Sequence, residues 1–268
     1  MSETKKSYSQ TLKSFNTTFW VGNLLQLTER WAYFSIFSLL ALYLVAGTDE
    51  GGLGLTHTQK GNIMAHITAV LYLLPLFFGV IADRIGYKLS LFISCVIMGV
   101  GYYLMSVAGS YWDTYFAFLL ASVGCSFFRP VVQGIIARHT DEENSTLGFG
   151  FFYMMGNIGG LLGPAMSSYL RTTMGWKVIF VQAMVVIVFN LIVILFFYKE
   201  PKAERKYNIP LLTEIKGSVQ NILGALKDKK LTILLLLMVG FWTVFNQLFY
   251  TLPNFIEDWV DSSKQSDW

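Results

Sequence analysis

The stretch that decides the fold is Gln26–Phe34, which reads Q-L-T-E-R-W-A-Y-F. Its polar side chains recur at helical spacing and would project from one face of a helix: Gln26, Glu29, Arg30 and Tyr33. This stripe interrupts an apolar segment that runs from Phe19 to Leu44. A charge at the centre of a bilayer costs about 2.5 to 3.5 kcal/mol, so we expect Glu29 and Arg30 to face a water-filled pathway or a partner. The alternative is that the two charges pair only to fasten two helices together.

The composition is that of a membrane protein. Of the 268 residues, 54% are hydrophobic and 14% are charged. A helix needs about 20 apolar residues to cross the hydrocarbon core of a bilayer. Uncharged runs long enough to do so occupy residues 61–82, 89–112, 144–170, 178–198 and 231–256, and two further spans carry charges, one at Glu29 and Arg30 and one at Arg129. We therefore predict an all-α membrane protein with seven transmembrane helices.

Basic residues predict the orientation of these helices. With the N-terminus in the cytoplasm, the inside segments hold 14 of the 20 Lys and Arg residues, namely Lys5, Lys6, Lys13, Arg84, Lys88, Arg138 and eight from Lys199 to Lys230. The outside segments hold Lys60, Arg171, Lys177 and Lys264. This bias follows the positive-inside rule. It predicts a multi-pass protein of an inner or plasma membrane, and it explains the formal charge of +3 without nucleic acid as a partner.

A second intramembrane cation, Arg129, lies in the segment G-C-S-F-F-R-P from Gly124 to Pro130. Arginine keeps its proton at any accessible pH. Glu29 is therefore set against two permanent cations, Arg30 and Arg129. An uncompensated positive charge in a low-dielectric cavity favours an anionic group, such as the carboxylate of a peptide. The alternative is a purely structural Arg-Glu-Arg triad.

Three features concern packing. Pro75 in Y-L-L-P is expected to bend its helix. Two pairs of glycines four residues apart, Gly156 with Gly160 and Gly159 with Gly163, let a second helix approach closely. His66 is expected as a packed, neutral side chain.

The sequence shows no pattern typical of a catalytic site. No nucleophile is paired with a base, and no metal-ligand spacing occurs. Cys95 and Cys125 both fall in predicted spans, where a structural disulfide is not expected. We predict a protein that is not an enzyme and has neither a metal nor a cofactor.

Taken together, the motifs resemble the proton-dependent oligopeptide transporters, the POT/PTR branch of the major facilitator superfamily. Members of this branch carry E-x-x-E-R-F-x-Y-Y on their first helix, matched here at Glu29, Arg30 and Tyr33, with Gln26 in place of the first Glu. The turn G-V-I-A-D-R-I-G-Y-K is similar to the superfamily signature and matches it at Gly79, Asp83, Arg84, Gly86 and Lys88. The resemblance covers about residues 15–260 and implies a six-helix N-terminal bundle plus a seventh transmembrane helix.

This resemblance implies roles for individual residues. The implied substrate-binding residues are Arg30, Tyr33, Tyr72, Asn157 and Trp242, and the implied charge network consists of Gln26, Glu29, Arg129 and Asn246. In the family, the turn from Gly79 to Lys88 locks two six-helix halves together on the cytoplasmic side. Gln26 and Asn246 stand where the family has protonatable coupling groups, so we expect proton coupling to be atypical or absent. Protons are thus an open candidate for the coupling ion, and Glu29 is the intramembrane carboxylate that remains.

The resemblance also predicts the organisation of the chain. We expect a cytoplasmic tail at 1–17, a six-helix bundle at 18–198, a cytoplasmic linker at 199–229 that superfamily members often fold as an amphipathic helix, and helix 7 with its outside end at 230–268. Because superfamily members have two six-helix halves, we expect a fragment or a truncated product. The missing C-terminal half would be supplied in cis or in trans.

The sequence leaves three functions open. The first is a carrier of di- or tripeptides, or of related small solutes, that works by alternating access in the lipid bilayer. The second is a transport-inactive pseudo-transporter or assembly partner, which the loss of both acids favours. The third is a seven-helix receptor, which the predicted orientation disfavours and whose retinal-binding form would need a lysine that helix 7 lacks.

Overall fold

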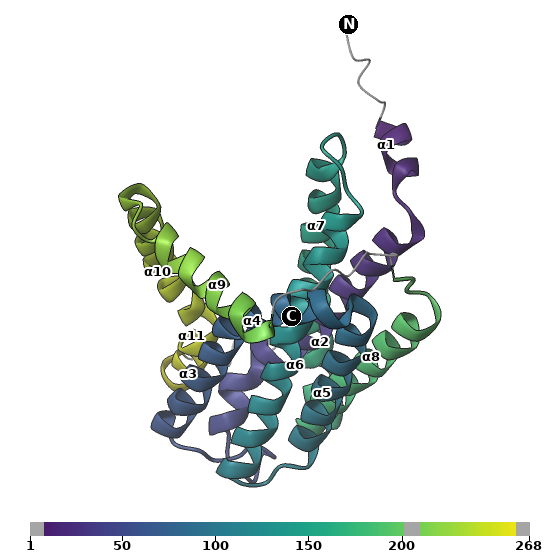
Figure 1. The fold of residues 1–268 in the computed structure, drawn as a ribbon. Coiled ribbons are helices and arrows are strands. Elements are labelled where there is room, and N and C mark those ends of the chain that lie inside the picture. The colour runs from purple at the N-terminus through teal and green to yellow at the C-terminus, as the bar shows by residue number, and fades with distance from the viewer. Residues whose placement is uncertain (1–7, 201–209, 261–268) are drawn as a thin grey trace, which may run out of the picture. The chain divides into compact units, whose positions relative to one another are not determined.

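The computed structural model describes residues 8–200 and 210–260. The described residues form α-helices and no strands (Figure 1), so the predicted all-α class is confirmed. Parts of the predicted tail, linker and C-terminal end, and with them Lys264, lie outside the described residues.

The helices fall into two compact units, which we describe separately. The first unit contains the described residues up to Ile36 and those from His66 to 200, and the second contains the rest. In chain order the helices are α1 (Tyr8–Ser14), α2 (Thr17–Val45), α3 (His57–Leu73), α4 (Pro75–Ile85), α5 (Tyr87–Val107), α6 (Tyr111–Arg138), α7 (Ser145–Met174), α8 (Lys177–Phe196), α9 (Leu211–Ala225), α10 (Lys229–Tyr250) and α11 (Leu252–Trp259).

Four helices of the described chain are long and apolar enough to cross a membrane, namely α5, α6, α8 and α10. Helices α3 and α4 pass the same criterion as one broken span, bent by 45°. Pro75 opens α4 at this break, so the bend expected from Y-L-L-P is confirmed. Helices α2 and α7 have 29 and 30 residues, which is sufficient length, but the polar stripe of α2 and the many Gly and Ser residues of α7 lower their hydropathy.

The predicted span 89–112 has the wrong bounds. Helix α5 ends at Val107, and Ala108 has extended dihedral angles, φ −61° and ψ 138°. The next helix, α6, begins at Tyr111 after Ser110, whose side chain accepts a hydrogen bond from the N–H of Asp113. The break escapes a hydropathy search because the run contains no charge.

The predicted span 231–256 is also divided in the structure. Helix α10 ends at Tyr250, and Pro253 lies in the first turn of α11. Proline is tolerated in the first turn of a helix but not in its interior, which explains the position of the break.

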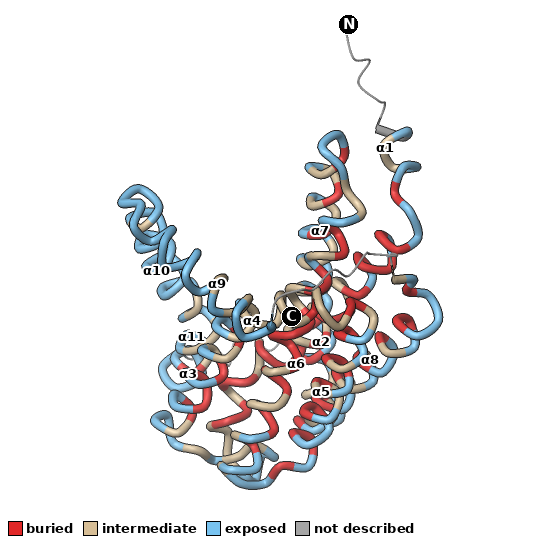
Figure 2. The backbone as a smooth tube through the Cα atoms, in the orientation of Figure 1, coloured by how far each residue is buried: buried red, intermediate tan, exposed pale blue. Residues whose placement is uncertain are grey.

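Helix α5 is central to the first unit, where it packs against α6 and α8. Glycines make the approach to α6 possible, since a Cβ on Gly101 would lie 2.6 Å from the backbone nitrogen of Ala121. A Cβ on Gly124 would lie 2.6 Å from Met98 Cγ. Figure 2 shows that buried residues follow α5 and α6, whereas α9 and α10 contain no buried residue.

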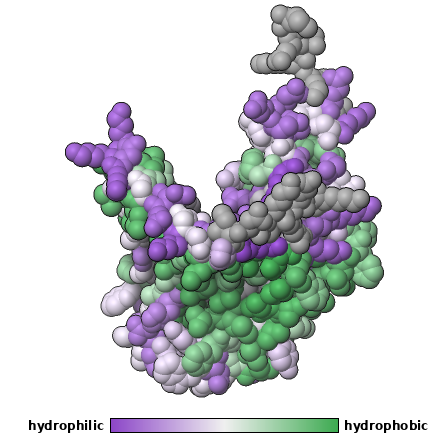
Figure 3. Space-filling model, viewed as in Figure 1, coloured by the Kyte–Doolittle hydropathy of each residue, from purple (hydrophilic) through white to green (hydrophobic). Residues whose placement is uncertain are grey.

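The outer face of the first unit is apolar. Helix α8 exposes large hydrophobic side chains at helical spacing, among them Val185, Phe189, Ile192 and Phe196. Figure 3 shows a broad hydrophobic area over α5 and α8 with hydrophilic residues beyond it. A soluble protein seldom exposes such a surface, and here it is suited to lipid.

His66 differs from the expectation. It is exposed, and its ring meets Tyr115 edge-on with the centroids 5.7 Å apart. The prediction of a packed side chain was wrong. Successive residues of a helix face different directions, and His66 lies on an exposed side of α3.

A buried lysine organises the second unit. Lys60 is 8% exposed, and its Nζ donates hydrogen bonds to Asn254 Oδ1 at 2.6 Å and to the carbonyl of Tyr250 at 3.3 Å. Asn254 also donates to the carbonyl of Ala41 at 3.4 Å. These bonds join α2, α3, α10 and α11 within this unit, and they satisfy a charge that would be costly to bury unpaired.

The glycine ridge of α7 packs on α2. A Cβ on Gly159 would collide with the carbonyl oxygen of Leu27 and lie 2.8 Å from Arg30 Cβ, and a Cβ on Gly163 would lie 2.7 Å from the nitrogen of Ser35. Ser35 Oγ in turn donates to the carbonyl of Gly163 at 3.2 Å. The predicted close helix approach is confirmed, and it holds α7 against the polar stripe.

This packing predicts a contrast between two substitutions in α7. Gly159→Ala should destabilise the protein by about 1 to 3 kcal/mol, because the added methyl group forces two backbones apart. Gly150→Ala should stabilise it by up to about 1 kcal/mol, because Ala is the better helix former and nothing lies within 4 Å of that site. Thermal unfolding of the purified protein measures both, and a Gly159→Ala variant as stable as Gly150→Ala would contradict the close packing.

Candidate functional site

The Glu29–Arg30 pair lies within α2. Glu29 is fully buried, and both of its carboxylate oxygens accept hydrogen bonds from Arg30, Oε2 from Nε and Oε1 from Nη2, each at 2.6 Å. This bidentate geometry is the strongest form of the Arg–carboxylate interaction. Both residues belong to α2. The alternative, a salt bridge whose only role is to fasten two helices together, is therefore not the one that this pair forms.

Tyr33 lies one turn further along α2 and contacts two cations. Arg30 Cζ is 4.6 Å and Arg129 Cζ is 4.7 Å from the centroid of the Tyr33 ring. Arg30 also lies 5.8 Å from the ring of Phe34. A guanidinium within about 6 Å of an aromatic ring is attracted to its face. Helices α2 and α6 therefore bring both predicted intramembrane cations to one tyrosine.

Arg129 keeps donors that the described residues do not satisfy. Its Nε and Nη2 atoms are buried and have no hydrogen-bond partner in the described chain. The ion pair of Glu29 in this part of the chain is with Arg30, so the predicted alternative of an Arg-Glu-Arg triad does not form. A buried hydrogen-bond donor without a partner lowers the stability of the fold by about 1 to 3 kcal/mol, and by more when the donor is charged. The site thus has one carboxylate, two cations and spare donors on Arg129.

The sequence around Arg129 explains its position. Pro130 follows directly, and because proline has no N–H it leaves one carbonyl of α6 without its helical bond. Phe127 stacks on Phe78 of α4 with centroids 4.6 Å apart, and a Cβ on Gly79 would lie 3.9 Å from Pro130 Cβ. Helix α4 therefore supports the segment of α6 that carries the second cation.

Among the other predicted site residues, Gln26 lies beside the charges. A Cβ on Gly156 would be 3.0 Å from Gln26 Nε2 and 3.8 Å from Arg30 Cγ, so α7 covers this face of α2. Asn157, the next residue of α7, is exposed, and so is Tyr72 of α3 at 58%.

Two predicted site residues belong to the second unit. Trp242 and Asn246 lie one turn apart on α10, and Trp242 meets Phe245 edge-on with centroids 5.3 Å apart. Trp242 is 48% exposed, so its ring is open to a ligand or to lipid.

The turn between α4 and α5 forms a compact polar network. Gly86 has a φ of 99°, in the left-handed region that favours glycine. Asp83 Oδ1 accepts hydrogen bonds from Tyr87 Oη and from Arg138 Nη2, both at 2.9 Å, and the Arg138 guanidinium lies 4.2 Å from the Tyr87 ring centroid. Asp83 therefore links the end of α4 to the end of α6 through Arg138 and to the start of α5 through Tyr87.

Sequence reasoning missed the residue that caps α5. The Glu200 carboxylate accepts hydrogen bonds from the N–H of Tyr87 at 2.8 Å and from the N–H of Lys88 at 2.7 Å. A carboxylate at a helix N-terminus accepts hydrogen bonds from the unpaired N–H groups there and interacts favourably with the positive end of the helix dipole. Lys88 Nζ donates a hydrogen bond to the carbonyl of Leu195 at 3.0 Å, and this bond joins the beginning of α5 to the end of α8. The one sign of this contact in the sequence is an acidic residue four positions after the end of α8.

Residues 19–259 match the Major Facilitator Superfamily. The chain is 27% identical over 215 residues to an uncharacterized transporter of Bacillus subtilis, covering 79% of this chain and 42% of that protein. It is 27% identical over 158 residues to a di-/tripeptide transporter of Lactococcus lactis, covering 57% of this chain and 30% of the relative.

The fold agrees with these matches. A crystal structure of a POT family transporter in complex with 5-aminolevulinic acid superposes with a TM-score of 0.66 at 22% identity, covering 87% of this chain and 50% of that structure. The chain therefore spans less than half the length of the two relatives and half of the solved structure. The predicted resemblance to POT transporters is confirmed, and these relatives are transporters, not enzymes. Together with the match over residues 19–259, this shows that the chain belongs to the Major Facilitator Superfamily of multi-pass membrane proteins.

Proposed function

We propose that this protein carries di- or tripeptides, or related small solutes with a carboxylate, by alternating access. The observation that supports this most is the Arg129 guanidinium, which is set beside Tyr33 with two buried nitrogens free to donate. One carboxylate and two cations leave this cluster with a net charge of +1, which favours an anionic ligand.

Each residue of the cluster then has a role. Arg129 donates to the substrate carboxylate, and Tyr33 holds both guanidinium groups in position through its ring. Arg30 is committed to Glu29 through two of its nitrogens, so it orients the carboxylate mainly through its charge. Asn157 and Tyr72, both exposed in the first unit, contact the remainder of the substrate.

The same contacts argue against the usual proton relay. Gln26 and Asn246 carry amides, which do not titrate, and Glu29 has both oxygens engaged by Arg30. We infer that the substrate gradient, and not a proton gradient, drives transport.

Alternating access requires a second half, supplied in cis or in trans, and a cytoplasmic contact that closes and opens. In this proposal the turn Gly79–Lys88 lies on the cytoplasmic side with the N-terminus. Asp83, bound to Arg138 and Tyr87, keeps the turn rigid, and Glu200 holds the beginning of α5 in place. Arg84, next to this network, contributes its positive charge to the inside surface. A transport-inactive role is not favoured, because the relatives are described as transporters.

Substrate binding to purified protein tests the role of Arg129. Arg129→Gln should weaken the binding of a dipeptide at least tenfold, because a charge-assisted hydrogen bond contributes about 1.5 to 3 kcal/mol. The matched control is Arg171→Gln, which removes a guanidinium that also lies on an aromatic ring, 4.0 Å from the Trp176 centroid. Wild-type protein should bind the peptide amide as weakly as Arg129→Gln binds the free peptide. Unchanged affinity in Arg129→Gln would refute the assignment.

Uptake into proteoliposomes tests the coupling. The initial rate of dipeptide uptake by the intact transporter should be the same with and without an imposed pH gradient. A double variant, Gln26→Glu with Asn246→Asp, restores acids at both positions and should gain a dependence on the gradient. Faster uptake by the wild type under an inward proton gradient would show that a relay exists without these acids, and no saturable uptake at all would favour the inactive alternative.

A further inference from the structure

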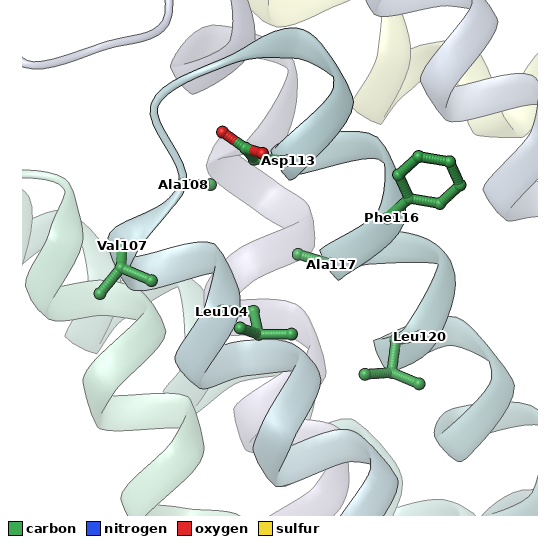
Figure 4. Close-up of a pocket in the computed structure, with 7 residues that line it drawn as sticks. All are labelled: Leu104, Val107, Ala108, Asp113, Phe116, Ala117 and Leu120. Carbon is green, nitrogen blue, oxygen red and sulfur yellow. The ribbon is translucent and has the colours of Figure 1, made fainter.

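A pocket lies away from the charge cluster, between the end of α5 and the beginning of α6. Its volume is about 550 Å³, and its walls are Leu104 and Val107 of α5 with Phe116, Ala117 and Leu120 of α6. Figure 4 shows Asp113 near one end of this pocket, close to the link between the two helices, with Leu104 and Leu120 further along them. The pocket is therefore apolar with a single carboxylate.

Asp113 is held in place by its own helix. Its Oδ2 accepts a hydrogen bond from Ser110 Oγ at 2.7 Å, and its N–H donates to the same hydroxyl at 3.2 Å. These bonds account for one carboxylate oxygen. Within the described residues no basic side chain forms an ion pair with Asp113, which leaves the other oxygen available to a ligand. The structural role of the acid is to accept this bond from Ser110, the N-cap of α6, and that role does not require an apolar pocket beside it.

Aromatic residues mark the depth of the pocket in the membrane. Tyr111, Trp112, Tyr115 and Phe116 form one cluster in the first turns of α6, and Trp112 and Tyr115 meet edge-on with centroids 5.8 Å apart. Trp112 is 62% and Phe116 59% exposed. Trp and Tyr gather where the headgroups meet the hydrocarbon. The Asp113 end of the pocket is therefore at headgroup depth, and Leu104 and Leu120 are at the depth of acyl chains.

We propose that this pocket binds phosphatidylethanolamine, with one acyl chain between α5 and α6 and the ammonium group on the Asp113 carboxylate. The volume is within the range of about 300 to 1,000 Å³ that small-molecule sites occupy. An ammonium group donates a charge-assisted hydrogen bond to a carboxylate, whereas the trimethylammonium group of phosphatidylcholine has no N–H to donate. An anionic headgroup would be repelled by Asp113.

Native mass spectrometry of the purified protein tests this site. The protein is equilibrated with equal amounts of phosphatidylethanolamine, phosphatidylcholine and phosphatidylglycerol of identical acyl chains, and the lipids retained are counted. Wild type should retain phosphatidylethanolamine at least fivefold over each of the others. Asp113→Asn keeps the acceptor for Ser110 but loses the charge, and it should reduce this preference to near unity. Asp49→Asn, the same change at an exposed loop residue, should leave the preference intact.

A second variant tests the apolar part of the pocket. Leu104→Trp places a larger side chain between α5 and α6 and should lower the retention of all three lipids together, because the space for the acyl chain is filled. Equal retention of the three headgroups by the wild type, or an unchanged preference in Asp113→Asn, would overturn the proposal. Unchanged retention in Leu104→Trp would place the bound lipid elsewhere and overturn it as well.

Discussion

The bond between Glu29 and Arg30 is the interaction on which the site depends. A carboxylate that is fully buried in α2 needs a partner, and the neighbouring guanidinium satisfies both of its oxygens. This leaves Arg129 with the Tyr33 ring as its neighbour and with two buried nitrogens unbonded. The net positive charge of the cluster is thus located on α6. Helix α4 supports this part of α6 through the stacking of Phe78 on Phe127.

The surrounding structure is built so that this cluster fits. Gly159 and Gly163 allow α7 to touch the backbone of α2 on either side of Trp31, and a side chain at either glycine would push the helices apart. At the other end of the unit, Asp83, Arg138 and Glu200 fix the turn before α5. Rigid support of this kind suits a carrier, in which bundles move as bodies around a site whose own geometry is preserved.

Much of the fold could be predicted from the sequence, because hydropathy, Pro75 and the glycine spacing are local signals. The break at Ala108 could not, since the residues on both sides are uncharged and only the Ser110 cap ends the run. The sequence also could not predict which arginine pairs with Glu29. Arg30 and Arg129 carry the same charge, and only the packing of α6 on α2 decides which one reaches the carboxylate. The Glu200 cap joins residues more than 100 positions apart, and its signal in the sequence was a lone acid after α8.

The most direct measurement of the central claim is a structure of the protein with a bound dipeptide, at a resolution that shows side chains. We expect a carboxylate oxygen of the peptide within about 3.2 Å of Nε or Nη2 of Arg129, with the Glu29–Arg30 bond unchanged. A peptide whose amino group faces this cluster, or whose carboxylate binds Arg30 after Arg129 has taken Glu29, would contradict it.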